Sequence, residues 1–327
     1  GFISVITLVN KPMKAIVYEK YGPPSVLQLK EIEKPTPKKD EVLVKIECST
    51  VSAGVIWMRK GKFPGSPLFT ILLRLFSGIN KPGIPVLGVE FSGVVEQAGE
   101  EVSLFKKGDA VYGTTTGLRQ GTYAEYVCVP VKRKDGVLIK KPKQLSFEEA
   151  AALPVGAMTA LDLLKKAKIQ TGKQVLIYGA SGSVGTYAVQ ISKYFDAIVT
   201  GVCSTSNIAL VSSIGADEVI DYTTNNISSL DKRYDIVFDA VGKLNKSTGK
   251  TLLTRGGKFI SVKSITKEKT SYLEILNQMI SEKRLTPVID RVYPLLQIQK
   301  AHQYVEAGHK KGNVVINQQK IEAISKF

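Results

Sequence analysis

A glycine-rich turn between an apolar run and a helical pattern is the clearest chemical signal in this sequence. The run Gln174–Tyr178 is typical of a buried parallel strand, and apolar residues at helical spacing follow Gly185. A strand, a tight turn and a helix in this order bind the pyrophosphate of a dinucleotide, because free amide groups at the helix N-terminus face the phosphates. The alternative is an ordinary strand-to-helix turn.

Two glycines of this turn have different expected roles. Gly182 lets the backbone approach a pyrophosphate closely, and Gly185 lets the helix pack against the strand. Ala180 stands where the usual fingerprint has its first glycine, with Gly179 just before it. The prediction of a dinucleotide site therefore depends on the context of the turn more than on the glycines alone.

The end of the next predicted strand distinguishes the two nicotinamide cofactors. NAD sites usually carry an acidic residue there, which holds the 2′-hydroxyl group of the ribose. The segment 202–207 contains no Asp or Glu, and its small polar side chains leave room for a 2′-phosphate. We therefore predict NADPH, with NADH as the less favoured cofactor. In the competing interpretation, Ser204 only caps the next helix.

The elements that must position this turn predict an α/β protein of two domains. The chain has 327 residues, of which 43% are hydrophobic and 23% charged, as in ordinary globular proteins. Residues 13–145 show short β-prone runs between Gly and Pro turns, which is typical of a small barrel. After a capping box at Ser146 and Glu149, strands alternate with helices, which predicts a doubly wound parallel sheet.

The net charge of +16 restricts the expected partners. Such a charge attracts anions, but the lysines are scattered, so we predict a solvated basic surface and no nucleic-acid partner. The longest apolar run, 68–76, is too short to span a bilayer, and we predict no membrane span. Three widely separated cysteines match no metal or disulfide spacing, which predicts a reducing, cytoplasmic location.

Further motifs resemble the medium-chain dehydrogenase/reductase superfamily, and within it the zinc-free quinone oxidoreductase-like group. They lie at 85–95, 107–111, 121–127, 150–154, 215–222 and 308–316. The resemblance implies a GroES-like β-barrel domain over residues 13–150, completed by 287–327, and a Rossmann domain over 151–286. The active site is then expected in the cleft between them.

The resemblance also implies that zinc is absent. Zinc-dependent members carry a Cys in the segment matching 52–55 and a His where this chain has Val89. Only Glu90 remains of that set, and we interpret it as a hydrogen-bonded structural carboxylate. A zinc site takes three or four ligands, so we predict no metal site. A zinc alcohol dehydrogenase is the least favoured alternative.

Cofactor contacts follow from the resemblance as well. It places Thr159 near the nicotinamide, the loop after the second strand at the 2′-phosphate, and the tail over the cofactor. The implied cofactor-binding residues are Thr159, Gly182, Ser183, Val184, Gly185, Ser204, Thr205, Asn207, Tyr222, Val241, Lys311 and Asn313. The family often has a basic residue near the position of Ser206, which this chain lacks.

The expected reaction is hydride transfer to an electron-poor, small-molecule acceptor, either a quinone or an α,β-unsaturated carbonyl. Ser52, Trp57 and Phe63 are the candidate pocket residues. Phe63 falls where enoyl-thioester reductases carry a proton-donating Tyr, so no catalytic residue is assigned. We predict that the apolar segment 66–85 covers the cleft. Packing of that segment onto the core or onto a dimer partner is the alternative.

The resemblance also bears on the oligomeric state and on an alternative function. Relatives often pair, which favours a homodimer. A different class of function stays open beside the enzyme: an NADPH-regulated nucleic-acid-binding or structural relative without turnover. Salt-sensitive RNA binding would favour that alternative, and turnover of a quinone would not.

Overall fold

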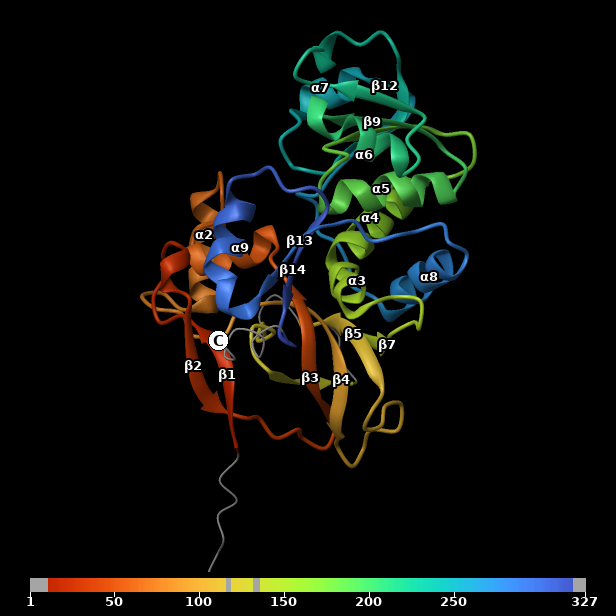
Figure 1. The fold of residues 1–327 in the computed structure, drawn as a ribbon. Helices are drawn as coiled ribbons and strands as arrows, with labels where there is room; N and C mark the ends of the chain where they lie inside the picture. The colour runs from red at the N-terminus through yellow and green to blue at the C-terminus, as the bar shows by residue number, and fades with distance from the viewer. Residues whose placement is uncertain (1–10, 116–118, 132–135, 320–327) are drawn as a thin grey trace, which may run out of the picture.

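The computed structural model of the chain describes residues 11–115, 119–131 and 136–319. Within these ranges the molecule has two lobes, a mainly β lobe and an α/β lobe, which lie at opposite ends of Figure 1. The mainly β lobe holds a seven-stranded sheet and a two-stranded sheet, and the α/β lobe holds a five-stranded sheet. No helix in the described part of the chain has the length and apolar character needed to cross a bilayer.

The five-stranded sheet confirms the predicted doubly wound parallel architecture. Its strand order is β10-β9-β8-β11-β12, and every neighbouring pair is parallel. The strands are β8 Gln174–Tyr178, β9 Ile198–Cys203, β10 Glu218–Asp221, β11 Tyr234–Asp239 and β12 Leu253–Ser261. The chain enters at the central β8 and winds outward on both sides, so the carboxyl end of β8 lies where such sheets bind nucleotides.

Helices bury both faces of this sheet. They are α4 Pro154–Lys166, α5 Ser183–Tyr194, α6 Ile208–Ser213, α7 Lys246–Thr251 and α8 Thr270–Ser281. The main core joins fully buried residues of the central strands, such as Ile177 and Phe238, to Leu161 of α4 and Leu276 of α8. Continuous apolar strands are the pattern expected when both faces are covered.

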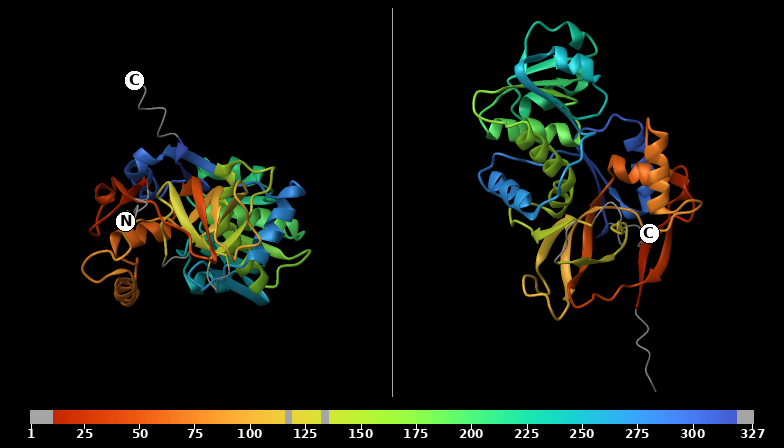
Figure 2. Two further views of the ribbon diagram at one scale, coloured as in Figure 1. Left: turned by 90° about the horizontal axis from the view of Figure 1, so that it is seen from below. Right: turned by 180° about the vertical axis from the view of Figure 1, so that it is seen from behind.

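The seven-stranded sheet contains the tail of the chain. Its order is β13-β14-β3-β4-β5-β7, with β6 paired to β3. The bounds are β3 Glu41–Thr50, β4 Glu90–Ala98, β5 Ala110–Thr114, β6 Tyr126–Pro130, β7 Val137–Lys140, β13 Ile289–Pro294 and β14 Asn313–Asn317. A separate hairpin pairs β1 Pro12–Val17 with β2 Gln28–Glu33. Since β14 pairs with β3, the tail returns to the barrel lobe (Figures 1 and 2).

Two helices interrupt the region that we expected to be mostly β. They are α1 Ala53–Lys60 and α2 Pro67–Ser77. Ser52 caps α1, and Gly61 ends it in the left-handed conformation. Ser66 caps α2. Serine before a helix and glycine after it are standard end signals, so the sequence held the information.

The remaining helical elements are short. They are α3 Phe147–Ala152, α9 Ile298–Glu306 and the single-turn 3-10 segments Pro24–Val26, Thr205–Asn207, Ile227–Ser229 and Leu295–Gln297. The predicted capping box of Ser146 and Glu149 is present at the start of α3. Ser92 of β4 donates a hydrogen bond to the Phe147 carbonyl oxygen at 2.5 Å. The predicted domain boundary at residues 150 and 151 therefore falls inside a helix that is fixed to the barrel lobe.

Candidate cofactor site and active site

The turn after β8 has the shape of a phosphate cradle. Gly179 has a φ of +80°, and a Cβ atom there would lie 2.0 Å from Val241 Cγ2. A Cβ on Gly185 would lie 2.0 Å from the Gly179 carbonyl oxygen, so α5 packs on the turn at a distance that only glycine permits. A Cβ on Gly182 would meet nothing nearer than 3.6 Å. That is an ordinary van der Waals contact, and Gly182 lies directly before α5, whose N-terminus can hold an anion.

The tail of the chain is docked onto this turn. Gly312 forms a parallel bridge with Gly182, and its amide donates to the Ser181 carbonyl oxygen at 2.8 Å. The Ser183 hydroxyl group donates to Asn313 Oδ1 at 2.5 Å. The structure therefore brings together Ser183, at the start of α5, and Asn313, two sites that the sequence separates by 130 residues.

The loop after β9 reaches the same place. Asn207 Nδ2 donates to Ser181 Oγ at 3.0 Å and to Ser204 Oγ at 3.2 Å. Lys311 Nζ lies 3.4 Å from the Ser206 carbonyl oxygen and can donate to it. The tail thus carries a cation to the position where the loop itself lacks a basic residue. Sequence order hides this pairing, because the two residues are 105 positions apart.

A carboxylate lies beside this loop, which the sequence argument did not include. The Thr205 hydroxyl group donates a short hydrogen bond to Asp221, at the end of β10. Thr223 donates to the same side chain from its amide at 2.9 Å and from its hydroxyl group at 2.6 Å. Hydrogen bonds from Thr205 and Thr223 lower the pKa of Asp221. Although residues 202–207 contain no Asp or Glu, the fold places the Asp221 carboxylate beside them, and the hydroxyl hydrogen of Thr205 is already engaged.

Tyr222 and Val241 lie on the exposed rim of this region. Tyr222 follows β10, is 48% exposed, and has its ring centroid 6.3 Å from that of Tyr178. Val241 is 44% exposed, and its amide donates to Asp239 Oδ1 at 3.2 Å. Both follow the carboxyl ends of strands, where doubly wound sheets bind ligands.

One face of α4 opens next to the turn. Val155 and Thr159, four residues apart, are half-buried while their helical neighbours are buried. Val184 is half-buried in the first turn of α5. Gly156 was not predicted as a site residue, yet a Cβ there would lie 2.7 Å from Ser183 Oγ. A glycine inside a helix weakens it, and this was the available signal that two helices approach closely here.

Buried ionisable groups border the site. Glu90 accepts hydrogen bonds from the Val155 amide at 2.8 Å and from the Thr50 hydroxyl group, and burial raises its pKa to about 7. This confirms the predicted hydrogen-bonded carboxylate. Lys310 was not predicted. Its ammonium group donates to the Gly312 carbonyl oxygen at 2.6 Å, and burial lowers its pKa to about 8.

The three candidate pocket residues lie together on the barrel lobe. Ser52 accepts a hydrogen bond from the Val55 amide at 3.5 Å, so its hydroxyl group caps α1. The ring centroids of Trp57 and Phe63 are 4.8 Å apart, and Phe63 lies 5.3 Å from Phe69 of α2. No hydrogen bond or ring contact recorded for the described residues joins this group to the glycine turn. Its role as the acceptor pocket stays a prediction.

The segment 66–85 does not pack its apolar side chains onto the protein's own core, which was one of the expected arrangements. Most of the apolar side chains of α2 are exposed, including Leu68, Ile71 and Phe76. Packing of these side chains onto the protein's own core is therefore wrong. Leu73 alone among the α2 side chains packs partly against the barrel core.

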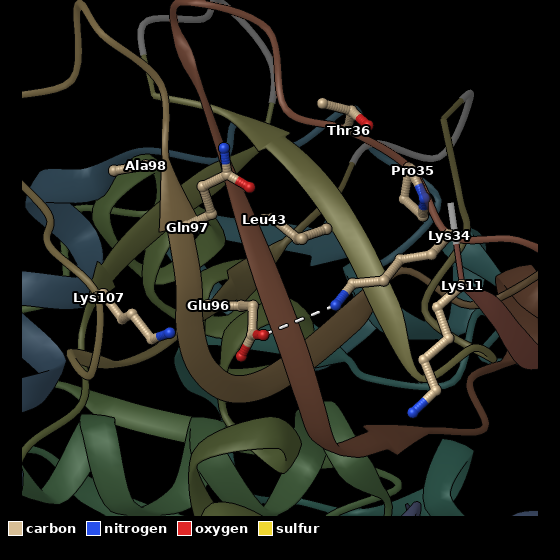
Figure 3. A pocket seen from close by; sticks show the side chains of 9 residues that line it. All are labelled: Lys11, Lys34, Pro35, Thr36, Leu43, Glu96, Gln97, Ala98 and Lys107. Carbon is tan, nitrogen blue, oxygen red and sulfur yellow. Dashed lines mark ion pairs between the residues drawn. The ribbon is translucent and has the colours of Figure 1, made fainter. Parts of the chain in front are cut away.

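Two cavities in the described part of the chain lie away from these residues. One of about 560 Å³ is on the barrel lobe and is shown in Figure 3. Lys34 and Glu96 form an ion pair of 3.7 Å across it. The second, of about 320 Å³, lies around Gln120 and Cys128. Neither is lined by a predicted cofactor or pocket residue.

Comparison with known proteins places this geometry in a family. The model described as "Alcohol dehydrogenase GroES-like domain" matches residues 38–143, and that described as "Zinc-binding dehydrogenase" matches 214–273 and 263–316. The NADPH-dependent alkenal/one oxidoreductase of Arabidopsis thaliana is 33% identical over 94% of this chain and 80% of its own length. The chain belongs to the medium-chain dehydrogenase/reductase superfamily, in its quinone oxidoreductase-like group.

Two further relatives support this membership. The quinone-oxidoreductase homolog of Spinacia oleracea is 34% identical over 94% of this chain and 98% of its own length. The solved quinone oxidoreductase from Coxiella burnetii superposes with a TM-score of 0.80, at 27% identity, over 94% of this chain and 99% of that chain. These relatives support an oxidoreductase with a nicotinamide cofactor, and the glycine turn with its docked tail is the part of this chain that fits one.

The described side chains that could bind a metal do not form a site. Among the described residues, no three His, Cys, Asp or Glu side chains come together. Both ring nitrogens of buried His302 are engaged: Nδ1 lies 3.1 Å from Arg59 Nη1 and Nε2 lies 3.2 Å from the Tyr123 hydroxyl group. Cys48 is buried in β3, as expected for a core residue. These side chains do not form the ligand set of a catalytic zinc site.

Proposed function

We propose that this chain is a zinc-independent, NADPH-dependent oxidoreductase that reduces a quinone or an α,β-unsaturated carbonyl. The observation that carries the proposal is the docking of the tail on the glycine turn, with Lys311 at the loop after β9. Two relatives bear names that match: an NADPH-dependent alkenal/one oxidoreductase and a quinone-oxidoreductase homolog.

The preference for NADPH follows from charge. The 2′-phosphate of NADPH is anionic, and an ammonium group within reach of it provides a charge-assisted hydrogen bond. Lys311 brings that group to the Ser206 carbonyl, beside Ser204 and Asn207. The carboxylate of Asp221 opposes this preference, but its hydrogen bonds to Thr205 and Thr223 turn it toward those partners. We infer that the cation dominates.

Zinc independence follows from the donor set. Val89 stands where zinc-dependent members carry a His, and Glu90 is occupied by Thr50 and the Val155 amide. Without a Lewis acid, an acceptor that is already electron-poor is the easier substrate for hydride transfer. Reduced nicotinamide supplies the hydride when bound.

The chain's own residues bind and orient the cofactor and the acceptor. The amides of residues 182–184 and the N-terminus of α5 would hold the pyrophosphate, because a helix N-terminus binds anions. Thr159, on the open face of α4, would contact the nicotinamide. Trp57 and Phe63 provide an apolar wall for the acceptor and exclude water from it. The proton that completes the reduction would come from water.

Domain bounds, assembly and compartment belong to the same proposal. We propose a barrel domain of 13–150 with 287–327, a Rossmann domain of 151–286, and a homodimer in solution. The cytoplasmic location also remains a proposal, since the relatives from Arabidopsis thaliana and Spinacia oleracea are chloroplastic by name. Light scattering coupled to size-exclusion chromatography tests the dimer.

The test of function is a substrate panel. Oxidation of NADPH is followed with a series of quinones and a series of 2-alkenals, in buffer treated to remove metals. The proposal expects turnover with at least one series. Tight NADPH binding without turnover on any acceptor contradicts it and favours a non-catalytic relative.

A further inference from the structure

The outward side of α2 is a continuous apolar surface. From Leu68 to Phe76 its side chains follow the spacing i, i+3, i+4, i+7 and i+8, which places them on one face of the helix, and Ile79 follows just beyond the helix end at Ser77. This α2 outer face consists of Leu68, Ile71, Leu72, Leu75, Phe76 and Ile79, which are between 38% and 69% exposed. So many apolar groups together on a water-facing helix are costly and mark an interaction surface.

Polar groups fix the opposite side of the helix to the barrel lobe. The Thr70 hydroxyl group donates to the Phe63 carbonyl oxygen at 3.2 Å, and the Phe63 amide donates back to it at 3.0 Å. The Arg74 guanidinium group lies 4.4 Å from the ring centroid of Tyr21, whose hydroxyl group is 2.9 Å from Ser77 Oγ. A surface helix usually turns its apolar side chains toward the protein and its polar side chains toward water. In α2 the polar side chains face the protein, so the folded lobe itself keeps the apolar side chains exposed.

The surroundings of the α2 outer face are basic. Segment 48–89 contains no Asp or Glu, and its basic residues are Arg59, Lys60, Lys62, Arg74 and Lys81. Glu306 pairs with the first two of these. No ion pair with a described residue is recorded for the other three. An apolar helical face flanked by lysines without an acidic partner in the described part of the chain, here Lys62 and Lys81, is the combination that binds the surface of anionic membranes.

We propose that the α2 outer face docks this protein on an anionic membrane surface, with the helix lying in the plane of the headgroups. With 11 residues, α2 is too short to span the bilayer and can only lie on it. A second copy of the chain fits the charge pattern poorly, because two such faces would bring Lys62 and Lys81 against like charges. Lipid phosphates complement those lysines.

Docking at this place also has a consequence for the acceptor, which rests on the proposed function. The aromatic rings of Phe69, Phe63 and Trp57 form a row that begins on α2. The ring centroids of Phe69 and Phe63 are 5.3 Å apart, and those of Phe63 and Trp57 are 4.8 Å apart. A row of aromatic rings therefore extends from the helix to the candidate pocket residues. Acceptors dissolved in a membrane, such as quinones with long hydrocarbon chains, would meet this apolar row at the docked surface.

Vesicle binding tests the proposal. The full chain is sedimented with phosphatidylcholine vesicles, with and without phosphatidylglycerol. We expect binding only to the anionic vesicles. Leu72→Ser with Phe76→Ser reduces the partition coefficient at least about tenfold, because their apolar area is no longer buried. Lys62→Gln with Lys81→Gln reduces it on the order of 20-fold. The matched control, Leu104→Ser with Ile265→Ser, removes exposed apolar side chains elsewhere and leaves it unchanged.

Three results overturn the proposal: no binding of the unmodified chain to either vesicle, equal loss in the control, or equal binding to neutral and anionic vesicles. A fourth is conversion of a lipid-free dimer to a monomer by the Leu72 and Phe76 changes, with vesicle binding intact, which assigns the face to a second copy. Vesicle binding needs no turnover, so its failure is distinct from failure of the proposed reaction.

Discussion

The ammonium group of Lys311 lies 3.4 Å from the main-chain carbonyl oxygen of Ser206. This contact links the tail of the chain to the loop after the second strand of the parallel sheet. That loop has hydroxyl and amide side chains but no cation of its own. Lys311 therefore supplies the charge that the loop lacks.

Replacing Lys311 tests the origin of cofactor preference. Lys311→Ala is expected to raise the dissociation constant of NADPH about tenfold, because one charge-assisted hydrogen bond to the 2′-phosphate is lost. The constant for NADH is expected to change less than about twofold. Quenching of protein fluorescence measures both. Lys283→Ala, at the end of α8, is the matched control. Equal weakening of NADPH and NADH would place Lys311 elsewhere on the cofactor.

The packing of α5 on the glycine turn depends on Gly185. In Gly185→Ala the new methyl group would lie 2.0 Å from the Gly179 carbonyl oxygen, so the helix must move away. We expect a loss of about 2 kcal/mol in the free energy of unfolding, as for other overpacked sites. Gly54→Ala is the control, because its nearest neighbour would be 4.0 Å away. Urea denaturation compares the two, and equal stability would show that the helix is not held there by close packing.

Glu90 makes stability depend on pH. Burial raises its folded-state pKa from 4.5 to about 7, so between these values the folded state holds a proton that the unfolded state has released. Stability from this group is therefore full below pH 4.5 and falls as pH rises toward 7, by at most about 1.4 kcal/mol per pH unit.

The variant Glu90→Gln removes this titration. Subtracting its denaturation midpoints from those of the unmodified chain across this pH range isolates the contribution. A stability difference that stays constant with pH would mean that Glu90 is ionised in both states.

Removal of metals is expected to leave activity intact. After dialysis against a chelator, turnover should change less than about twofold, because residues 11–115, 119–131 and 136–319 offer no three-ligand set for zinc. Elemental analysis of the purified protein provides the parallel measurement. Stoichiometric zinc, together with loss of turnover on chelation, would restore the zinc-dependent interpretation.

Phe63 tests the acceptor pocket. Phe63→Ala removes the ring that contacts Trp57 and Phe69, so the KM for an apolar quinone is expected to rise about fivefold to tenfold. The NADPH dissociation constant should not change, since the ring lies on the barrel lobe. Leu104→Ala, exposed elsewhere on the same lobe, is the control. A change in NADPH binding with an unaltered KM for the acceptor would remove Phe63 from the pocket.

The parallel sheet and its glycine turn were predictable because their signals are local. Apolar strands, the turn at Gly182 and the capping box at Ser146 each occupy a few consecutive residues. Contacts between distant segments were not predictable in this way. Asp221 meets Thr205 only because β10 lies beside β9, and Lys311 meets Ser206 only because the tail crosses the lobes.

Helix α2 shows a second limit of sequence reasoning. Its apolar side chains have helical spacing, which normally identifies the face that packs on a core. Here Thr70, Arg74 and Ser77 face the protein instead, and the apolar residues are exposed. Periodicity identifies a face but does not say whether protein, lipid or another chain covers it.

Steady-state kinetics with both cofactors test the central claim most directly. The ratio of kcat/KM for NADPH to that for NADH is measured with the best quinone or 2-alkenal, in metal-free buffer. We predict turnover with a preference for NADPH of about tenfold or more, in keeping with one added charge contact. A preference for NADH would contradict the role of Lys311 and the loop after β9. Absence of turnover with both cofactors would contradict the proposed function itself.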